Sequence, residues 1–219
     1  MKKILLICLL AGPMPAVHAG EHGENISALK LERIMIGAAF KTGSVPKLHS
    51  EIALIYDQRT QHPLYAKNSD ATAPIASITK LMTAMVVLDA QLPLDEEISI
   101  DVADIDTVKG THSRLRIGMT LARSELLKLA LMASENRAAS ALARSYPGGY
   151  NAAIAAMNAK ARELGMHDTR FLDPTGLSSN NVSTAYDLVK MVAAARDYAL
   201  IHQYTTAASH SVDGWRGRE

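Results

Sequence analysis

The chain has almost no cysteine, little excess charge of either sign and no helical pair of histidines at metal-ligand spacing. Its single cysteine is Cys8, so no disulfide can form within one chain. The formal net charge is +1, which excludes the broad basic face that binding to nucleic acid requires. The scattered histidines predict no bound metal, because zinc-binding helices carry their histidines at fixed short spacings.

A long apolar run is also missing, and the run that is present is typical of a secretory signal. Lys2 and Lys3 precede the apolar residues 4–10, and residues 17–19 (Val-His-Ala) form a small-residue cleavage site. The run is far shorter than the ~20 residues needed to cross a bilayer, so we expect no stable membrane span. Cleavage of residues 1–19 would remove the cysteine and two lysines and leave a net charge of −1. The sequence therefore predicts an exported, periplasmic protein.

The rest of the chain divides into a short N-terminal segment and one domain. Residues 20–47 predict a helix and a loop, and residues 48–219 carry the stronger patterns. A strand over 51–56, a polar turn and a second strand over 64–66 predict a hairpin. The first strand is apolar on both faces, so we expect it to be covered on both sides. No further strand is evident, and the first strand is expected to have a single neighbour.

Helices predominate from residue 77 onward. Residues 77–88 and 126–132 are apolar almost all round, which indicates buried helices. Residues 150–164 have one apolar face, and Gly165 follows at the position of a C-terminal cap. A last helix is predicted to start near Thr184.

Three serines are followed by a lysine three positions later, the minimal pattern of a serine nucleophile with a lysine base. They are Ser27 with Lys30, Ser44 with Lys47, and Ser77 with Lys80. The first pair belongs to an ordinary surface helix, and Pro46 interrupts the helical register of the second. Only Ser77 is expected at the start of a buried helix.

Ser77 and Lys80 lie one helical turn apart, so both side chains are expected on the same face. Apolar neighbours would remove water from the ammonium group, and burial lowers the pKa of a lysine toward the neutral form. A neutral lysine can accept the serine proton and generate the nucleophile. The alternative is a helix-capping serine beside a lysine whose charged end reaches solvent.

Ser134-Glu135-Asn136 directly follows the second buried helix, which would hold this turn firmly. Ser134 could relay a proton to the leaving amine through Lys80, and the Asn136 side chain could hold a substrate amide. The alternative is a polar turn that ends a helix, since serine and asparagine are common in such turns. The order of the two motifs along the chain favours the catalytic interpretation.

Four segments together resemble the low-molecular-mass penicillin-binding proteins, the D-alanyl-D-alanine carboxypeptidase and endopeptidase family. They are residues 74–86, 131–139, 173–178 and 181–185. The first is similar to the family's active-site helix, the second to its second motif, and the last two to a hallmark of its peptidases. Glu135 and residues 146–150 most resemble the DD-endopeptidase branch. The resemblance extends over roughly residues 45–205.

This resemblance implies an α/β, β-lactamase/transpeptidase-like fold with a helical lobe and a sheet. It implies cleavage of D-alanyl peptide bonds in peptidoglycan through an acyl-enzyme on Ser77, with Lys80 as proton acceptor. Ser134 would be the proton relay and Asn136 the substrate-positioning residue. The expected partners are peptidoglycan stem peptides and cross-links, with β-lactam antibiotics as covalent inhibitors. The resemblance implies no metal and no organic cofactor.

The family's third motif, Lys-Thr-Gly on a late strand, is expected after all these segments. Residues 41–43 carry these letters before Ser77, in a loop, so we interpret them as coincidence. Residues 48–219 would then form an incomplete catalytic domain without its C-terminal strands. Two alternatives follow: a non-catalytic chain that only binds peptidoglycan peptides, and a serine β-lactamase. The β-lactamase is disfavoured because Glu163 lacks the surrounding motif that such enzymes use to activate water.

Overall fold

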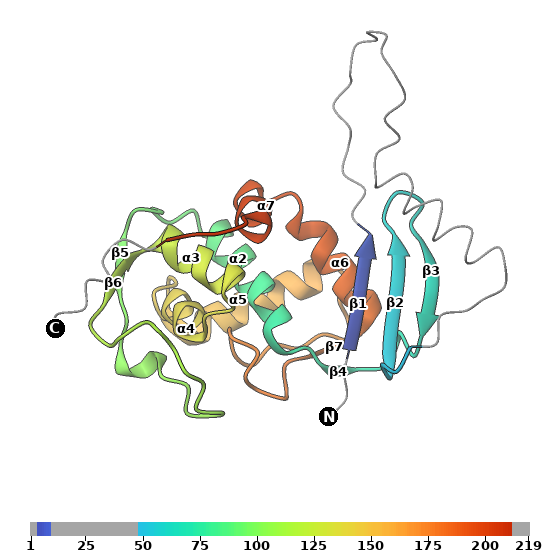
Figure 1. Ribbon diagram of the computed structural model, residues 1–219, viewed down its shortest axis with the longest axis horizontal. Helices are drawn as coiled ribbons and strands as arrows, with labels where there is room; N and C mark the ends of the chain where they lie inside the picture. The colour runs from blue at the N-terminus through green and yellow to red at the C-terminus, as the bar shows by residue number, and fades with distance from the viewer. Residues whose placement is uncertain (1–3, 10–47, 212–219) are drawn as a thin grey trace, which may run out of the picture. The chain divides into compact units, whose positions relative to one another are not determined.

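The computed structural model describes residues 4–9 and 48–211, which belong to two compact units, Met1–Ser69 and Asp70–Glu219 (Figure 1). Several predictions lie outside the described residues: the helix and loop of 20–47, residues 10–19 of the expected signal, Lys41-Thr42-Gly43, and the pairs Ser27/Lys30 and Ser44/Lys47.

The first unit contains a three-stranded sheet in the order β1-β2-β3. Its strands are β1 (Ile4–Leu9), β2 (Ile52–Asp57) and β3 (His62–Lys67). The predicted hairpin is confirmed, because β2 and β3 pair antiparallel with Ala53 opposite Lys67. The Asp57 carboxylate closes the turn by accepting the backbone N–H groups of Arg59 (2.9 Å) and Thr60 (3.4 Å).

The prediction that β2 has a single neighbour is wrong. Residues 4–9, the expected core of the secretory signal, form β1 and pair parallel with β2, so that Ile4 lies opposite Ile52. A strand edge carries unpaired N–H and C=O groups, which the backbone of an added strand can pair with. Isoleucine favours the strand conformation, so this apolar run can supply such a strand. Cleavage of residues 1–19 stays a prediction.

The second unit is mainly helical (Figure 1). Its elements are β4 (Ala73–Pro74), the 3-10 helix η1 (Ala76–Ile78), α2 (Thr79–Asp89), β5 (Glu97–Ser99), the 3-10 helix η2 (Val102–Asp104), β6 (Thr120–Ala122), α3 (Arg123–Met132), α4 (Asn136–Arg144), α5 (Gly149–Glu163), β7 (Val182–Ser183), α6 (Ala185–Ala195) and α7 (Ala199–Thr206). The helices α2, α3, α5 and α6 confirm the four that the sequence predicts.

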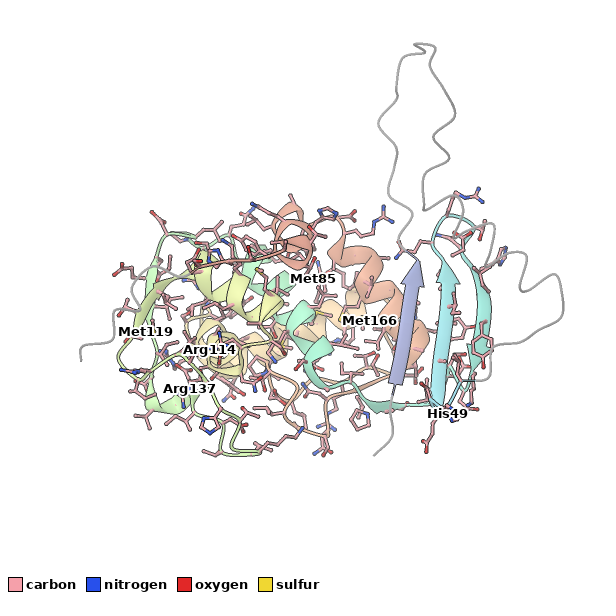
Figure 2. All side chains as sticks on the ribbon, in the orientation of Figure 1. His49, Met85, Arg114, Met119, Arg137 and Met166 are labelled. Carbon is pink, nitrogen blue, oxygen red and sulfur yellow. The ribbon has the colours of Figure 1, made fainter. Side chains whose placement is uncertain are left out.

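Helix α2 is central in this unit, which explains why it is apolar almost all round. It contacts α3, α4, α5, α6 and α7. Met82 and Met85 on α2 are fully buried, and Met166 after α5 is 1% exposed. Figure 2 labels Met85 and Met166 among the side chains of this unit. A helix that is covered on every side can keep a lysine away from water, and α2 carries Lys80 in its first turn.

The sequence did not reveal α4, which contacts both α3 and α5. Alanines make up most of its inner face, and Ala138, Ala139 and Ala141 are fully buried. Small side chains let helices approach closely, and the contrast between the alanines and arginines of α4 gives it an apolar and a polar face. Thus α4 lies deep in the unit and carries Asn136 at its N-terminus.

Buried Asp104 connects η2 to α4. This carboxylate is 3% exposed, and it accepts hydrogen bonds from the Ser140 hydroxyl (2.9 Å) and the Arg144 guanidinium (2.9 Å). It also caps η2 together with Asp101. The loop that follows η2 is therefore anchored to α4 where it begins.

Candidate active site

Ser77 lies in η1, which is one turn of 3-10 helix between β4 and α2. The prediction that it begins the α-helix needs this small correction, because the helix starts two residues later. The turn is held at Ile75, whose backbone N–H donates to the Asn181 carbonyl (3.0 Å). Ala76 has a φ of +48°, which is uncommon for a residue with a side chain. The tight backbone leaves the Ser77 side chain exposed.

Lys80 is 2% exposed and lies at the centre of the site. Its Nζ atom is 3.1 Å from Ser77 Oγ, 2.7 Å from Asn136 Oδ1 and 2.8 Å from the Thr175 carbonyl oxygen. The structure therefore brings together three of the four site residues that the sequence predicts: Ser77, Lys80 and Asn136.

Burial lowers the pKa of Lys80 to about 8, although the nearby Asp173 and Glu135 carboxylates oppose this shift. Water stabilises an ammonium far better than a neutral amine, so its removal favours loss of the proton. With this pKa about a tenth of the lysine is neutral at pH 7, against well under a thousandth for an ordinary lysine. The site thus contains a usable base near neutral pH.

The partners of Lys80 also determine where its lone pair points. A neutral amine has two N–H groups and one lone pair. The Thr175 carbonyl can only accept a hydrogen bond, and so can Asn136 through Oδ1. Both contacts consume an N–H group. The remaining direction is toward Ser77 Oγ, 3.1 Å away, so the neutral amine is oriented to accept the serine proton.

Asn136 is the first residue of α4. Glu135 is the N-cap of this helix, and its carboxylate accepts the Arg137 backbone N–H (3.1 Å). The Asn136 side chain contacts Lys80 through Oδ1, and its Nδ2 donates to Thr111 Oγ1 (2.9 Å). An amide NH₂ has two N–H groups, so one remains for a further acceptor.

Ser134 lies between α3 and α4, with a φ of +55° and an exposed side chain. No hydrogen bond joins its hydroxyl to any residue in the described part of the chain. The structure therefore does not bring Ser134 into direct contact with Lys80, unlike Asn136. Its role as a proton relay stays a prediction.

The segment 173–178 forms a compact loop around one carboxylate. Oδ1 of Asp173 accepts the backbone N–H of Thr175 (2.6 Å) and of Gly176 (2.7 Å), and Oδ2 accepts that of Ser178 (2.8 Å). Gly176 has a φ of +83°, and a Cβ atom there would lie 1.8 Å from the Ala76 carbonyl oxygen. Only glycine therefore allows this loop to pack against the backbone before Ser77.

Asn181 connects the same loop to the turn that carries Ser77 and is fully buried. Its Nδ2 donates to Thr79 Oγ1 (3.1 Å) and to the Asp173 carbonyl (2.8 Å). Sequence reasoning identified residues 173–178 and 181–185 as a turn and a family hallmark, and missed that they hold the turn that carries Ser77. The available signal in the sequence was Asn181, a few residues after Asp-Pro-Thr-Gly; its burial is evident only in the structure.

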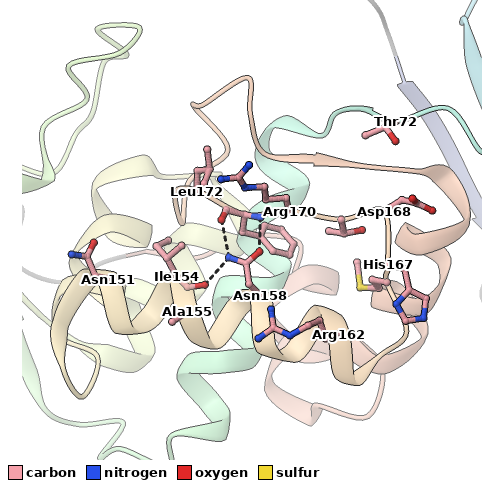
Figure 3. Close-up of a pocket in the computed structure, with 13 residues that line it drawn as sticks. Thr72, Asn151, Ile154, Ala155, Asn158, Arg162, His167, Asp168, Arg170 and Leu172 are labelled. Atoms are coloured by element: carbon pink, nitrogen blue, oxygen red, sulfur yellow. Dashed lines mark hydrogen bonds between the residues drawn. The ribbon is translucent and has the colours of Figure 1, made fainter.

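Two of the hollows in the second unit show how the candidate site relates to the surface. One, of about 410 Å³, is lined by Glu135 and Ala133 of the second motif and by residues 112–115 and Leu129. The other, of about 900 Å³, lies between α5 and residues 166–172 and includes neither Ser77 nor Lys80. Figure 3 shows Asn158 in this hollow, and its side chain hydrogen-bonds to the backbone of Phe171. The smaller hollow borders the candidate site, and the larger one is separate from it.

The residues that the structure describes include no cluster of three or more His, Cys, Asp or Glu placed to hold a metal ion. Within the same residues, no helix combines the length and apolar character needed to cross a membrane.

Comparison with known proteins agrees with the motifs. A family model described as D-alanyl-D-alanine carboxypeptidase matches residues 39–214. The D-alanyl-D-alanine endopeptidase of Escherichia coli K12 is 54% identical over 169 residues, which cover 77% of this chain and 54% of that protein. The endopeptidase of the same name from Pseudomonas aeruginosa is 53% identical over 166 residues, which cover 76% of this chain and 54% of that protein. The chain thus spans about half the length of the curated relatives it matches.

Solved structures agree with the expected fold. The Streptomyces K15 DD-transpeptidase is similar with a TM-score of 0.68 and 30% sequence identity, over 74% of this chain and 66% of that one. A D-alanyl-D-alanine carboxypeptidase from Mycobacterium tuberculosis is similar with a TM-score of 0.65, over 75% of this chain and 63% of that one. The β-lactamase/transpeptidase-like fold inferred from the motifs is confirmed. The matched residues and the arrangement around Lys80 lead to one conclusion: the chain belongs to the D-alanyl-D-alanine carboxypeptidase family of serine peptidases.

Proposed function

We propose that this protein cleaves D-alanyl peptide bonds of peptidoglycan through an acyl ester on Ser77. The observation that carries the proposal is Lys80, which is 2% exposed and lies 3.1 Å from Ser77 Oγ. Its two other partners are acceptors, so its lone pair is directed at the serine. Burying a lysine costs free energy that its hydrogen bonds only partly offset, and a role in catalysis gives a reason for that cost.

In the proposed reaction, Lys80 Nζ takes the Ser77 hydroxyl proton while Oγ bonds to the carbonyl carbon of the D-alanyl residue. The C–N bond then breaks, and the leaving amine receives the proton from Lys80, with Ser134 as the proposed relay. Water hydrolyses the ester and restores Ser77. Asn136 keeps one N–H of its side chain for a substrate carbonyl, because the other donates to Thr111.

We infer the cross-linked form of peptidoglycan as the substrate, since the relatives at 54% and 53% identity are endopeptidases. β-Lactams, which carry a reactive amide, would acylate the same serine and act as covalent inhibitors. The proposed location is the periplasm, in keeping with the N-terminal pattern of residues 1–19 and with a substrate outside the cytoplasmic membrane.

Covalent labelling tests this proposal directly. After incubation with a fluorescent penicillin and proteolysis, mass spectrometry is expected to find the adduct on the peptide that contains Ser77. Prior incubation with cross-linked muropeptide should slow the labelling, and the muropeptide should be converted into its two halves. An adduct on Ser134, or no adduct at all, would contradict the proposed nucleophile. Labelling without conversion of the muropeptide would favour the binding-only alternative.

The pKa of Lys80 predicts how acylation depends on pH. Only the neutral amine can take the serine proton, so the rate should rise about tenfold per pH unit at low pH and level off above about 8. The measurement is the rate of labelling by fluorescent penicillin over a range of pH in which thermal melting shows a folded chain. A rate that stays flat or falls as the pH rises would exclude Lys80 as the base.

A further inference from the structure

The loop after η2 is organised around one carboxylate. Oδ1 of Asp106 accepts the backbone N–H groups of Val108 (2.8 Å) and Lys109 (2.9 Å). Oδ2 accepts both the backbone N–H (2.9 Å) and the side-chain hydroxyl (2.7 Å) of Thr111. The loop therefore returns to α4 with the Thr111 side chain held in one orientation.

The Thr111 hydroxyl has a single hydrogen, and it donates that hydrogen in its bond to the Asp106 carboxylate. Toward any other partner its oxygen can only accept a hydrogen bond. That partner is Asn136, whose side-chain Nδ2 lies 2.9 Å away. An Asn136 amide turned by 180° would place its oxygen against the Thr111 oxygen, with no hydrogen between them. While Thr111 donates to Asp106, the loop thus favours one of the two amide orientations.

The favoured orientation presents Asn136 Oδ1 to Lys80, at 2.7 Å. The reversed amide would direct an N–H group at Nζ instead. That group would occupy the lone pair that the neutral amine needs for Ser77 and would disfavour the ammonium form. The direction of this one amide therefore decides whether Lys80 can serve as a base toward Ser77.

We propose that Thr111 and Asp106 are positioning residues of the acylation site, which fix the Asn136 amide so that the Lys80 lone pair faces Ser77. This inference rests on the proposed function. It assigns a role to residues 106–111, which lie outside the three motifs of the family. The arrangement depends on Asp106 being an acceptor on both oxygens, and hence on its ionised form.

Asp106 meets that requirement over the whole pH range of interest. Burial alone would raise the pKa of its carboxyl, but the hydrogen bonds from Lys109, Thr111 and Val108 outweigh burial and lower it to about 2. The loop is also fixed where it begins, because Asp104 ties η2 to α4.

The test compares Thr111→Val, which removes the hydroxyl at nearly constant shape, with Thr111→Ser, which keeps it. Thr111→Val is expected to lower the plateau rate of Ser77 labelling at least about tenfold, because a misplaced catalytic group costs one to two orders of magnitude. Its pH midpoint should move downward from that of the wild type, since Lys80 loses an acceptor. Thr111→Ser should stay within about threefold of the wild type, because the hydrogen-bonding hydroxyl remains.

Asp106→Asn is the second variant, and it replaces one of the two acceptor oxygens of the carboxylate by an NH₂ group that can only donate. If the new NH₂ faces Thr111, the threonine must accept from it and direct its own hydrogen at Asn136, which favours the reversed amide. The expected changes in rate and midpoint have the same sign as for Thr111→Val. Thr107→Val is the matched control, because it makes the same substitution at an exposed position of the same loop. It should label like the wild type.

Competitive acetylation of Lys80 by acetic anhydride measures its pKa without any substrate. It separates failure of this inference from failure of the proposed function. If the wild-type chain does not label at Ser77, the proposed function fails, and the acetylation midpoint still reports the amide orientation. A midpoint in folded Thr111→Val and Asp106→Asn equal to that of the wild type would overturn the inference. So would a Thr111→Ser variant that loses as much rate as Thr111→Val.

Discussion

Replacing Lys80 by methionine is expected to lower the rate of Ser77 acylation by about 10²–10⁴-fold, the usual contribution of a general base. Methionine matches the length and volume of the lysine stem, so α2 can keep its packing against the surrounding helices. It has no lone pair basic enough to accept the serine proton. The measurement is the labelling rate by fluorescent penicillin at a pH above 8, where the wild-type lysine is mostly neutral.

Lys128→Met is the matched control for this substitution. Lys128 lies on α3, where its ammonium is 3.4 Å from the Glu125 carboxylate and 5.2 Å from the centre of the Tyr204 ring. None of these groups contacts Ser77, so labelling should stay near the wild-type rate. Equal losses in the two variants, or a Lys80→Met variant that labels within a few-fold of the wild type, would contradict the role of Lys80.

Replacing Gly176 by alanine is expected to reduce both the stability and the reactivity of the site. The added Cβ would lie 1.8 Å from the Ala76 carbonyl oxygen and 3.0 Å from the Ser77 nitrogen. Both atoms belong to the backbone and cannot rotate away, so either the loop or the turn that carries Ser77 must move. We expect at least about 10²-fold slower acylation, because displacement of a catalytic group by 1 Å has that effect. The free energy of unfolding should fall by more than about 2 kcal/mol.

Gly118→Ala separates the steric clash from backbone strain. Gly118 has a φ of +80°, nearly that of Gly176, but its Cβ would meet no atom within 4 Å. The control variant should therefore lose only about 1–2 kcal/mol, the cost of the left-handed conformation for alanine, and should label normally. Thermal melting and labelling rates of both variants give the comparison. Similar losses of stability and labelling rate in the two variants would show that backbone strain alone, without the clash, explains the effect of Gly176→Ala.

The helices were predictable because apolar residues recur at helical spacing on the faces that pack against other helices. The run 77–88 is apolar on all sides, and α2 is surrounded by five helices. The spacing of Ser77 and Lys80 likewise predicted a contact, which the structure gives as 3.1 Å. By contrast, α4 escaped notice because it is only nine residues long and begins at Asn136, within the residues that also fit a polar turn. The strand β1 escaped because an apolar run after two lysines equally fits an export signal.

The supporting parts of the site could not be read from the sequence for a different reason. Thr175 contributes a backbone carbonyl, which any residue would supply. Gly176 matters because a distant backbone passes close to it, and this approach is a property of the folded chain. Thr111 and Asp106 act on Lys80 through Asn136, and an exposed polar loop contains many such residues. Motifs locate reacting groups, and the folded chain shows what holds them.

The hydrogen bond from Asn181 to Thr79, which lies two residues after Ser77, has a consequence for the synthesis and folding of the chain. Asn181 and Thr79 are 102 positions apart, and Lys80 and Thr175 are 95 apart. A growing chain carries Ser77 and Lys80 long before it carries these partners. Until Asn181 packs against Thr79, whether at the ribosome or after export, Lys80 lacks part of its cover, and we expect Ser77 to be unreactive. Chain closure over such separations is slow compared with helix formation. Reactivity toward a penicillin would thus mark a late event in the maturation of this molecule.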